Sequence, residues 1–170
     1  MTWLLDYFGS PVGELRLILD EEGKLRSLAF PSEDGAAMRD RLPADVEIRL
    51  GSAPTSIREA LAAYFAGQLE ALDRISVETG GSSFERAAWA ALRAIPPGQT
   101  RTYAQQAAAI GAPRAFRAVG GANHRNPVAI VIPCHRVIGA DGSLTGYGGG
   151  MVRKRWLLAH EGALRLGLTA

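Results

Sequence analysis

The chain of 170 residues contains one cysteine, Cys134, and this thiol lies in a stretch rich in ionisable residues. His135 and Arg136 follow it directly, and His124 and Arg125 precede it in the same segment. A thiol beside cationic groups has a lowered pKa and tends toward the thiolate, which is the nucleophilic form. We therefore predict a reactive thiolate at Cys134. The alternative is a structural thiol, because free cysteine is among the most buried residue types.

The ionisable side chain nearest to this thiol in the sequence is that of His135, and Glu161 is one of only three acids in residues 81–170. His135 is adjacent, but neighbouring side chains of an extended chain point opposite ways, so a turn or a bridging water is needed before His135 can act as its base. Glu161 follows a helix predicted at residues 152–160, where a carboxylate that merely ended the helix would face the negative end of the helix dipole. This placement favours a functional role for Glu161 over a structural one.

The segment before the cysteine predicts how the thiol is held. Residues 128–132 form a continuous apolar run rich in β-branched residues, which predicts a buried strand. Pro133 cannot continue a strand ladder and is expected to end it. Cys134 is therefore expected at the end of a strand, preceded by a turn at Asn126-Pro127.

Two short helices are predicted upstream of this strand. Thr102 and Gln105 have the spacing of a capping box, which predicts a helix that Gly111 ends. Pro113 is expected to open a second helix through residues 114–119. Two short helices around a tight turn are typical of a helix-turn-helix, although many helical hairpins bind nothing.

Charge is distributed unevenly along the chain. Residues 1–80 contain 8 lysines and arginines against 14 acids, a net charge of −6, whereas residues 81–170 contain 11 basic residues against 3 acids, a net charge of +8. A glycine-serine stretch separates these halves, so we predict two domains, 1–80 and 81–170. The basic half, with Arg114 and Arg117 on its second short helix, favours a polyanion as partner; a solvated basic surface is the alternative.

The acidic half predicts a small α/β scaffold without a catalytic cluster. Residues 15–19 and 25–30 flank a polar turn and predict a hairpin, to which residues 3–8 could add a third strand. One helix is expected at residues 57–66 in this half, and another, with Trp89 in its core face, opens the basic half at residues 84–95. The capping boxes are Ser56 with Glu59 and Ser82 with Glu85, and the helix stops are Gly67 and Pro96.

Composition narrows the protein class. No window has the apolar length needed to span a bilayer, and the first residues lack the basic flank and apolar core of a signal peptide. We expect a cytoplasmic monomer without membrane contact. A single cysteine excludes an internal disulfide and the usual four-ligand cysteine zinc site, and no metal or other cofactor is expected.

Several of these motifs, in this order, strongly resemble the O6-alkylguanine-DNA alkyltransferases, also called methylated-DNA–protein-cysteine methyltransferases. The resemblance is dense from about Phe84 to Glu161 and looser over the amino-terminal half. It is carried by Ser10-Pro11-Val12-Gly13, Tyr64-Phe65-Ala66-Gly67, Arg117-Ala118-Val119-Gly120, Asn126-Pro127, Ile132-Pro133-Cys134-His135-Arg136-Val137-Ile138, Tyr147, Gly149 and Lys154. It implies an α+β fold, with a small ribonuclease H-like α/β domain of antiparallel strands and a mostly helical carboxy-terminal domain containing the helix-turn-helix.

The resemblance implies DNA repair by direct damage reversal. Cys134 would accept the alkyl group of O6-alkylguanine, and also of O4-alkylthymine, in one irreversible displacement. His135 and Glu161 would activate the thiol through a water, and Asn126 would shape the hinge between the helix-turn-helix and the active-site strand. Each protein would repair one lesion, because a thioether offers water no carbonyl to attack.

The resemblance also implies a mode of DNA binding. The damaged base of double-stranded DNA would be rotated out of the helix, and Arg117 would enter the base stack from the minor groove. Tyr103 would crowd the target phosphate and donate a hydrogen bond toward the departing guanine. The remaining implied contacts are Ala118, Gly120 and Gly121 for DNA, and Tyr147, Gly148, Gly149 and Lys154 for the base pocket.

The chain departs from the family pattern at Phe116, where the family usually keeps a small residue beside the arginine finger. A bulky ring there would clash with the groove or insert as an extra wedge. The zinc site of some relatives is not supported, because its cysteines are absent. Two other functions fit parts of the sequence: a sensor that binds alkylated bases without transfer, and a cysteine hydrolase built on Cys134, His135 and Glu161.

Overall fold

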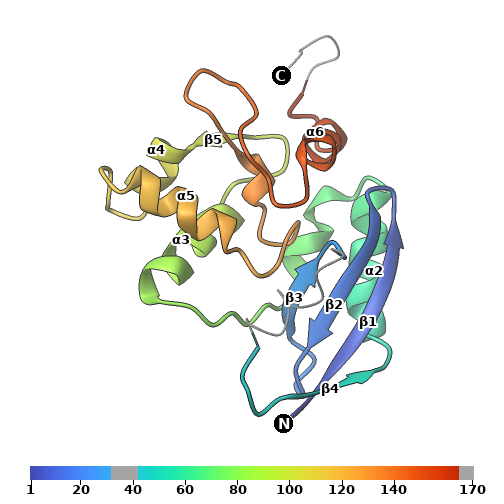
Figure 1. Cartoon of the computed structure of the whole chain (residues 1–170). Helices are drawn as coiled ribbons and strands as arrows, with labels where there is room; N and C mark the ends of the chain where they lie inside the picture. Colours follow the sequence, from blue (N-terminus) through green and yellow to red (C-terminus); the bar gives the residue numbers. More distant parts are fainter. Residues whose placement is uncertain (32–41, 165–170) are drawn as a thin grey trace. The chain divides into compact units, whose positions relative to one another are not determined.

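The computed structural model describes residues 1–31 and 42–164 of the chain (Figure 1). Contacts divide the chain into two compact units, with the boundary between Glu78 and Thr79. The first unit is built on a mixed sheet and the second is mostly helical, which is the predicted α+β class. The assignment of domains at residues 1–80 and 81–170 stays a prediction, because compactness does not show that either part folds alone.

The first unit contains a four-stranded sheet in the order β3-β2-β1-β4. The predicted hairpin is confirmed as β2 (Gly13–Leu19) and β3 (Leu25–Ala29), and the possible third strand forms β1 (Thr2–Ser10), antiparallel to β2. The sequence analysis missed β4 (Glu47–Leu50), which pairs with β1 in parallel. The sheet is therefore mixed rather than wholly antiparallel.

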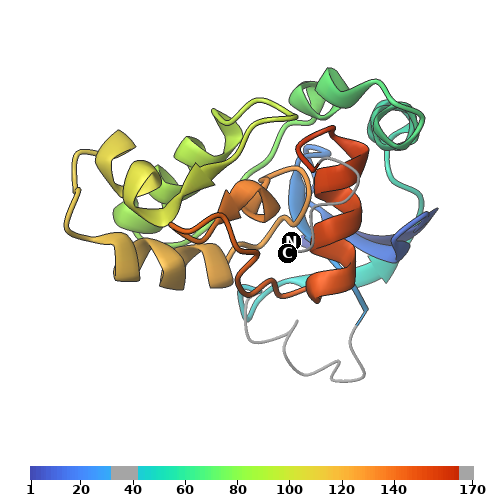
Figure 2. The same cartoon turned by 90° about the horizontal axis from the view of Figure 1, so that it is seen from above.

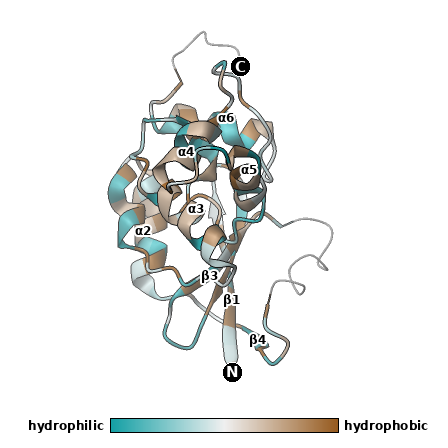
Figure 3. Ribbon diagram, turned by 90° about the vertical axis from the view of Figure 1, so that its left-hand side faces the viewer, coloured by the Kyte–Doolittle hydropathy of each residue, from teal (hydrophilic) through white to brown (hydrophobic). Residues whose placement is uncertain are grey.

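The helix of the first unit, α2 (Thr55–Phe65), begins differently from the prediction. Pro54 is its N-cap and no side chain caps it, so the predicted capping box at Ser56 is wrong. Gly67 ends the helix region as predicted, with a φ of 108° that favours glycine. One face of α2 is buried, and both hydrophilic and hydrophobic segments are visible along it in Figure 3. A six-residue 3₁₀ helix, η1 (Leu69–Arg74), packs on it.

The second unit opens with α3 (Ser83–Arg93), whose predicted capping box between Ser82 and Glu85 is confirmed. The predicted core position of Trp89 is confirmed as well, since the residue is buried. Its indole N–H donates to the backbone carbonyl of Ala122, with 2.8 Å between the nitrogen and the oxygen. This hydrogen bond ties α3 to the later helix α5.

The two short helices are α4 (Tyr103–Ala109) and α5 (Phe116–His124), which lie beside each other and α3 (Figure 2). The capping box that opens α4 is confirmed, and Gly111 follows the helix with a φ of 76°. The predicted bounds of the second helix are wrong, because α5 begins three residues after Pro113 and runs on past Gly120-Gly121. Pro113 lies in the connecting turn instead.

The predicted strand at residues 128–132 is wrong. This run folds into turns, closed by hydrogen bonds from the amide of Ile132 to the carbonyl of Val128 and from Val131 to Ala129. Ile130 has a φ of 70°, in the left-handed region that β-branched residues rarely adopt. The run is apolar because four of its side chains are buried, and burial rather than strand pairing explains its composition.

Four elements complete the described part of the second unit. The 3₁₀ helix η2 (Cys134–Arg136) leads into β6 (Val137–Ile138), which pairs in parallel with β5 (Arg101–Thr102). The predicted helix at residues 152–160 is confirmed as α6 (Met151–His160). Within the described residues, no helix has the length and apolar character that crossing a membrane requires.

Candidate active site

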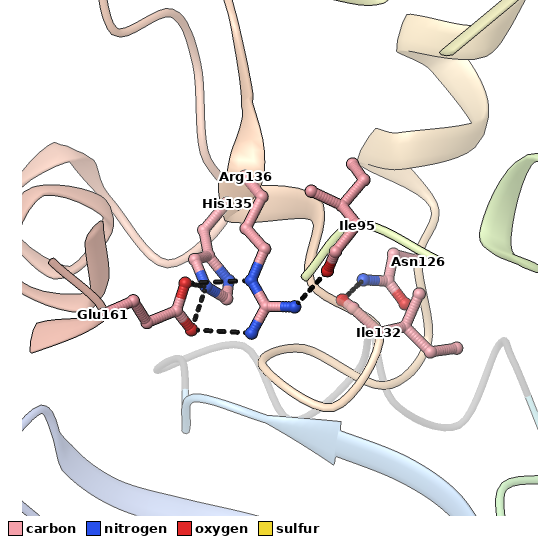
Figure 4. Close-up of polar contacts among 6 residues, drawn as sticks. All are labelled: Ile95, Asn126, Ile132, His135, Arg136 and Glu161. Atoms are coloured by element: carbon pink, nitrogen blue, oxygen red, sulfur yellow. Dashed lines mark hydrogen bonds and ion pairs between the residues drawn. The ribbon is translucent and has the colours of Figure 1, made fainter. Parts of the chain in front are cut away.

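Asn126 holds the turns that lead to the cysteine. Its side-chain amide donates to the carbonyl of Ile132 at 2.7 Å (Figure 4). Its side-chain oxygen accepts from the amide of Val128 at 3.0 Å. One side chain thus satisfies two backbone groups of the turns, which have no paired strand to bond with. The Asn126 side chain also hydrogen-bonds the thiol of Cys134.

Cys134 is the first residue of η2 and is partly exposed, so the expectation of a cysteine at a strand end is wrong. The residue lines a pocket of about 350 Å³ in the second unit. The pocket is lined by Tyr103, Gly120, Asn123, His124, Cys134, Gly146, Tyr147 and Gly148. The helical turn of η2 supplies the change of chain direction that an extended Cys-His pair would lack.

The neighbouring residues form a fully buried charged cluster, shown in Figure 4. His135 Nε2 lies 3.0 Å from both carboxylate oxygens of Glu161. Arg136 grips the same carboxylate with two hydrogen bonds of 2.9 Å, from Nε and Nη2, and donates from Nη1 to the carbonyl of Ile95 at 2.6 Å. Glu161 is the C-cap residue of α6, where the cationic guanidinium of Arg136 offsets the unfavourable helix dipole.

This geometry fixes the protonation of the histidine ring. A carboxylate only accepts hydrogen bonds, so Nε2 of His135 carries the proton that Glu161 accepts. Nδ1 of His135 is then the basic nitrogen; it is buried and has no hydrogen-bond partner among the described residues. An unsatisfied buried acceptor on the residue that follows Cys134 is suited to take a proton.

The pKa shifts contradict the predicted resting thiolate. Burial raises the pKa of Cys134, against the opposing effects of the Asn126 hydrogen bond and the charge of Lys154, so the resting group at neutral pH is the thiol. Burial lowers the pKa of His135, although Glu161 opposes this shift, and the imidazole is therefore neutral, with Nδ1 able to accept a proton. The thiol must lose its proton during the reaction rather than before it.

Glu161 stays ionised throughout. Burial alone would raise the pKa of its carboxyl group, but hydrogen bonds from Arg136 and His135 hold it well below its ordinary value. A permanent carboxylate beside the imidazole favours the protonated ring, should His135 accept a proton.

Tyr103 and Tyr147 both line the pocket. The hydroxyl of Tyr103 lies 3.1 Å from the side-chain oxygen of Thr145, which fixes the ring at the start of α4. Burial and the adjacent Cys134 raise the pKa of Tyr147 well above its ordinary value, so this hydroxyl remains a hydrogen-bond donor. Its ring meets the ring of His135 edge to face, with 6.4 Å between centroids.

Lys154 is fully buried and does not line the pocket. Its ammonium group donates to the carbonyl of Val137 at 2.6 Å and to that of Thr145 at 2.8 Å. The lysine thereby ties the loop that carries Tyr147 to β6. Its role in the structure is to hold this loop through hydrogen bonds, and not to line the pocket as predicted. Burial lowers the pKa of Lys154 to about 8, against the opposing charge of Cys134.

The residues expected to contact DNA lie on α5. Arg117 and Ala118 are exposed, whereas Gly120 and Gly121 are partly buried. Of these four, only Gly120 lines the pocket. A Cβ atom at Gly120 would lie 3.7 Å from the ring of Tyr103, in ordinary contact, so its small size keeps the pocket open rather than avoiding a clash.

Sequence reasoning missed three polar residues of this region. Arg136 was noted only as a charged neighbour of the thiol, yet it is the main partner of Glu161. Asn123 and His124 line the pocket, and Asn123 forms a reciprocal amide pair with Gln106 that joins α5 to α4. Two sequence features could have indicated this pairing. Arg136 closely follows an apolar run, and Glu161 is one of only three acids in the basic half. Gly148 lines the pocket as expected, whereas Gly149 does not.

Comparison with known proteins gives consistent results. The family described as 6-O-methylguanine DNA methyltransferase, DNA binding domain, matches residues 83–163. The methylated-DNA–protein-cysteine methyltransferase of Salmonella typhimurium is 44% identical over 172 residues, covering 96% of this chain and 98% of the relative. The corresponding protein of Methanosarcina barkeri is 46% identical over 160 residues, covering 92% and 95%.

A solved structure is similar over nearly the whole chain. The crystal structure of Mycobacterium tuberculosis OGT in complex with DNA is 39% identical, covers 96% of this chain and 94% of that chain, and has a TM-score of 0.79. Full-length likeness to curated enzymes and to this structure establishes both the fold and the family. The chain therefore belongs to the methylated-DNA–protein-cysteine methyltransferase (O6-alkylguanine-DNA alkyltransferase) family, and it repairs DNA by direct reversal through transfer of the methyl group of O6-methylguanine.

Proposed function

We propose that Cys134 is the residue that receives the methyl group, and that it is consumed in a single turnover. The observation that carries this proposal is a thiol in a pocket, directly followed by a buried His135-Glu161 pair whose free nitrogen is basic. No other cysteine exists in the chain.

The first step is removal of the thiol proton. Because the pKa of Cys134 is raised and that of His135 is lowered, the resting pair is a neutral thiol and a neutral imidazole. The proton passes from the sulfur to Nδ1 of His135 through a bridging water. Glu161 stabilises the resulting imidazolium through Nε2, at a carboxylate that Arg136 keeps in position.

The second step is a displacement at the alkyl carbon. The sulfur forms a bond to this carbon as its bond to O6 breaks, and the electron pair of the broken bond stays on the guanine. The hydroxyls of Tyr103 and Tyr147, which both line the pocket, are suited to donate hydrogen bonds toward the developing negative charge. Guanine leaves after taking up a proton, and a thioether remains on Cys134.

The reaction stops at the thioether, because water has no carbonyl to attack and no group in the site can remove an alkyl carbon from sulfur. We extend the proposal to O4-alkylthymine, which carries the same alkyl-oxygen bond on a flat base. A cytoplasmic location and a monomer form part of the proposal, since an acceptor thiol must stay reduced and a single chain supplies every group invoked.

For binding, we propose that α5 approaches double-stranded DNA through the minor groove while the alkylated base rotates into the pocket. Arg117 is exposed on α5 and would fill the gap in the base stack, with Ala118, Gly120 and Gly121 close to the backbone. Support comes from the net charge of +8 in residues 81–170 and from the M. tuberculosis relative, whose structure contains DNA. A closely approaching backbone suits the small side chains of this segment.

The acceptor is tested by mass spectrometry after incubation with duplex DNA containing O6-methylguanine. We expect one added methyl group, located on Cys134 by peptide mapping, and none in the Cys134→Ala variant. DNA binding without any added methyl would support the sensor alternative instead. Repeated turnover of an ester or amide substrate would support the hydrolase alternative. The same assay with O4-methylthymine tests the second substrate.

The proposed insertion of Arg117 into the base stack is tested with Arg117→Ala. We expect slower repair of duplex DNA and unchanged reaction with free O6-benzylguanine, because a free base needs no rotation out of a helix. Equal losses on the two substrates would assign Arg117 to the pocket or the fold rather than to DNA opening.

A further inference from the structure

Phe116 is an exposed aromatic residue at the start of α5, with 46% of its surface accessible. Among the described residues of the second unit, the only other large apolar side chain that is exposed to this degree is Val152. Single exposed apolar residues are common on protein surfaces and need no explanation by themselves. The position and surroundings of Phe116 therefore carry the argument.

Helix geometry places Phe116 in line with the pocket. Residues four apart in a helix lie on the same face, and Gly120 follows Phe116 by four and lines the pocket. His124, four residues further, lines it too. Phe116 therefore lies one helical turn beyond the pocket rim, and Arg117 is offset from it by about 100° around the helix.

The charge around Phe116 indicates what the ring meets. Arg114 and Arg117 flank it and are exposed, and the first turn of α5 contains no acidic residue. Flat aromatic rings next to arginines are the combination with which proteins bind nucleobases and phosphates together. A ring held in water beside these charges fits a partner that presents both flat bases and negative charge, which is DNA.

We infer that Phe116 inserts into the DNA base stack beside Arg117, so that the lesion step is opened by two adjacent side chains, one ring and one guanidinium. This inference rests on the proposed approach of α5 to DNA. Base rotation leaves neighbouring base pairs without a stacking partner. An aromatic ring replaces that stacking contact more completely than a guanidinium alone. Phe116 is then a determinant of how readily duplex DNA is opened, and not part of the alkyl-transfer chemistry.

The kinetic test compares Phe116→Ala, Phe116→Leu and Phe116→Trp on two substrates. We expect Phe116→Ala to react about tenfold more slowly with duplex O6-methylguanine, equivalent to about 1.4 kcal/mol, and at the wild-type rate with free O6-benzylguanine. Phe116→Trp should stay within about twofold of wild type, and Phe116→Leu should fall between the two, because stacking scales with the aromatic face. Tyr7→Ala, an exposed aromatic of the first unit, is the matched control and should not change either rate.

A salt titration of DNA affinity separates stacking from charge. Phe116→Ala should weaken binding while leaving the slope of log affinity against log salt unchanged, since no phosphate contact is lost. Arg117→Ala is the contrasting variant and should reduce that slope by about 1 only if its guanidinium contacts a phosphate.

Base opening is measured in the Cys134→Ala background, which makes the result independent of methyl transfer. A 2-aminopurine beside the lesion should become brighter when wild-type Phe116 unstacks it, and less so with Phe116→Ala. Unchanged brightness together with an unchanged duplex rate would overturn the inference, as would a faster duplex rate or equal slowing on the free base. A Phe116-dependent dimer in sedimentation would assign the ring to a second copy of the chain and overturn it as well. Failure of the proposed acceptor chemistry would instead appear as absent methylation of Cys134 in the wild-type protein.

Discussion

The two units of the chain differ in how many charged side chains they bury. In the first unit, among the described residues, Asp20 is the one buried charged side chain, and it caps a hairpin turn. At the other extreme, the pair of Arg49 and Glu47 has both partners more than half exposed. In the second unit the buried polar residues are Gln106, Asn123, His135, Arg136, Lys154 and Glu161.

This difference separates stability from chemistry. An exposed ion pair contributes little because water competes with it, whereas a buried charge must be matched by precise partners or it destabilises the fold. The second unit buries charged groups near Cys134 despite this destabilisation. Arg136 and His135 compensate Glu161, and backbone carbonyls compensate Lys154. Among its described residues, the first unit shows no comparable buried cluster of charges, and its mainly apolar core needs no compensation.

Neutralising one carboxylate in each unit gives the largest expected contrast. Glu161→Gln leaves Arg136 buried without its counter-charge, so we expect a loss of about 3–5 kcal/mol in the free energy of unfolding. Glu47→Gln, in the exposed pair, should cost less than about 1 kcal/mol. Urea unfolding followed by circular dichroism measures both, and similar values for the two variants would contradict the contrast.

The two lysines of the chain allow the two units to be compared through the pH dependence of stability. The pKa of Lys154 is about 8 when folded and near 10.4 when unfolded, so between these values the unfolded chain binds more protons. Stability therefore rises with pH across this window by up to about 3 kcal/mol for this group. We expect the difference in unfolding free energy between wild type and Lys154→Met to grow by that amount from pH 8 to pH 10.5.

The control is Lys24→Met, which removes the other lysine of the chain, a partly exposed one in the first unit. Its pKa is raised by Glu22, so its own contribution can only fall as pH increases, and exposure keeps that contribution small. A wild-type minus Lys154→Met difference that stays flat with pH would show that the buried ammonium group keeps its ordinary pKa.

Sequence patterns predicted the elements that local chemistry determines. The polar turn between β2 and β3 and the capping box at Ser82 were sufficient, because a hairpin and a capped helix are specified by residues close in sequence. Residues 128–132 were misassigned, because β-branched residues mark burial and the turns depend on the side chain of Asn126. The site was half predicted: Glu161 stood out as a rare acid, whereas Arg136 could be recognised as its partner only once the chain was folded.

The smallest contrast concerns helix starts, where the capping box predicted at Ser82 formed and the one predicted at Ser56 did not. Ser82 accepts a hydrogen bond from the amide of Glu85, whereas Ser56 lies inside α2, one residue after its start, and Pro54 is the N-cap. We expect Ser82→Ala to lower the free energy of unfolding by about 1 kcal/mol and Ser56→Ala to change it by less than about 0.5 kcal/mol. Urea unfolding measures both. A larger loss at Ser56 would mean that α2 is capped by its own serine after all, and that the two units start their helices by the same means.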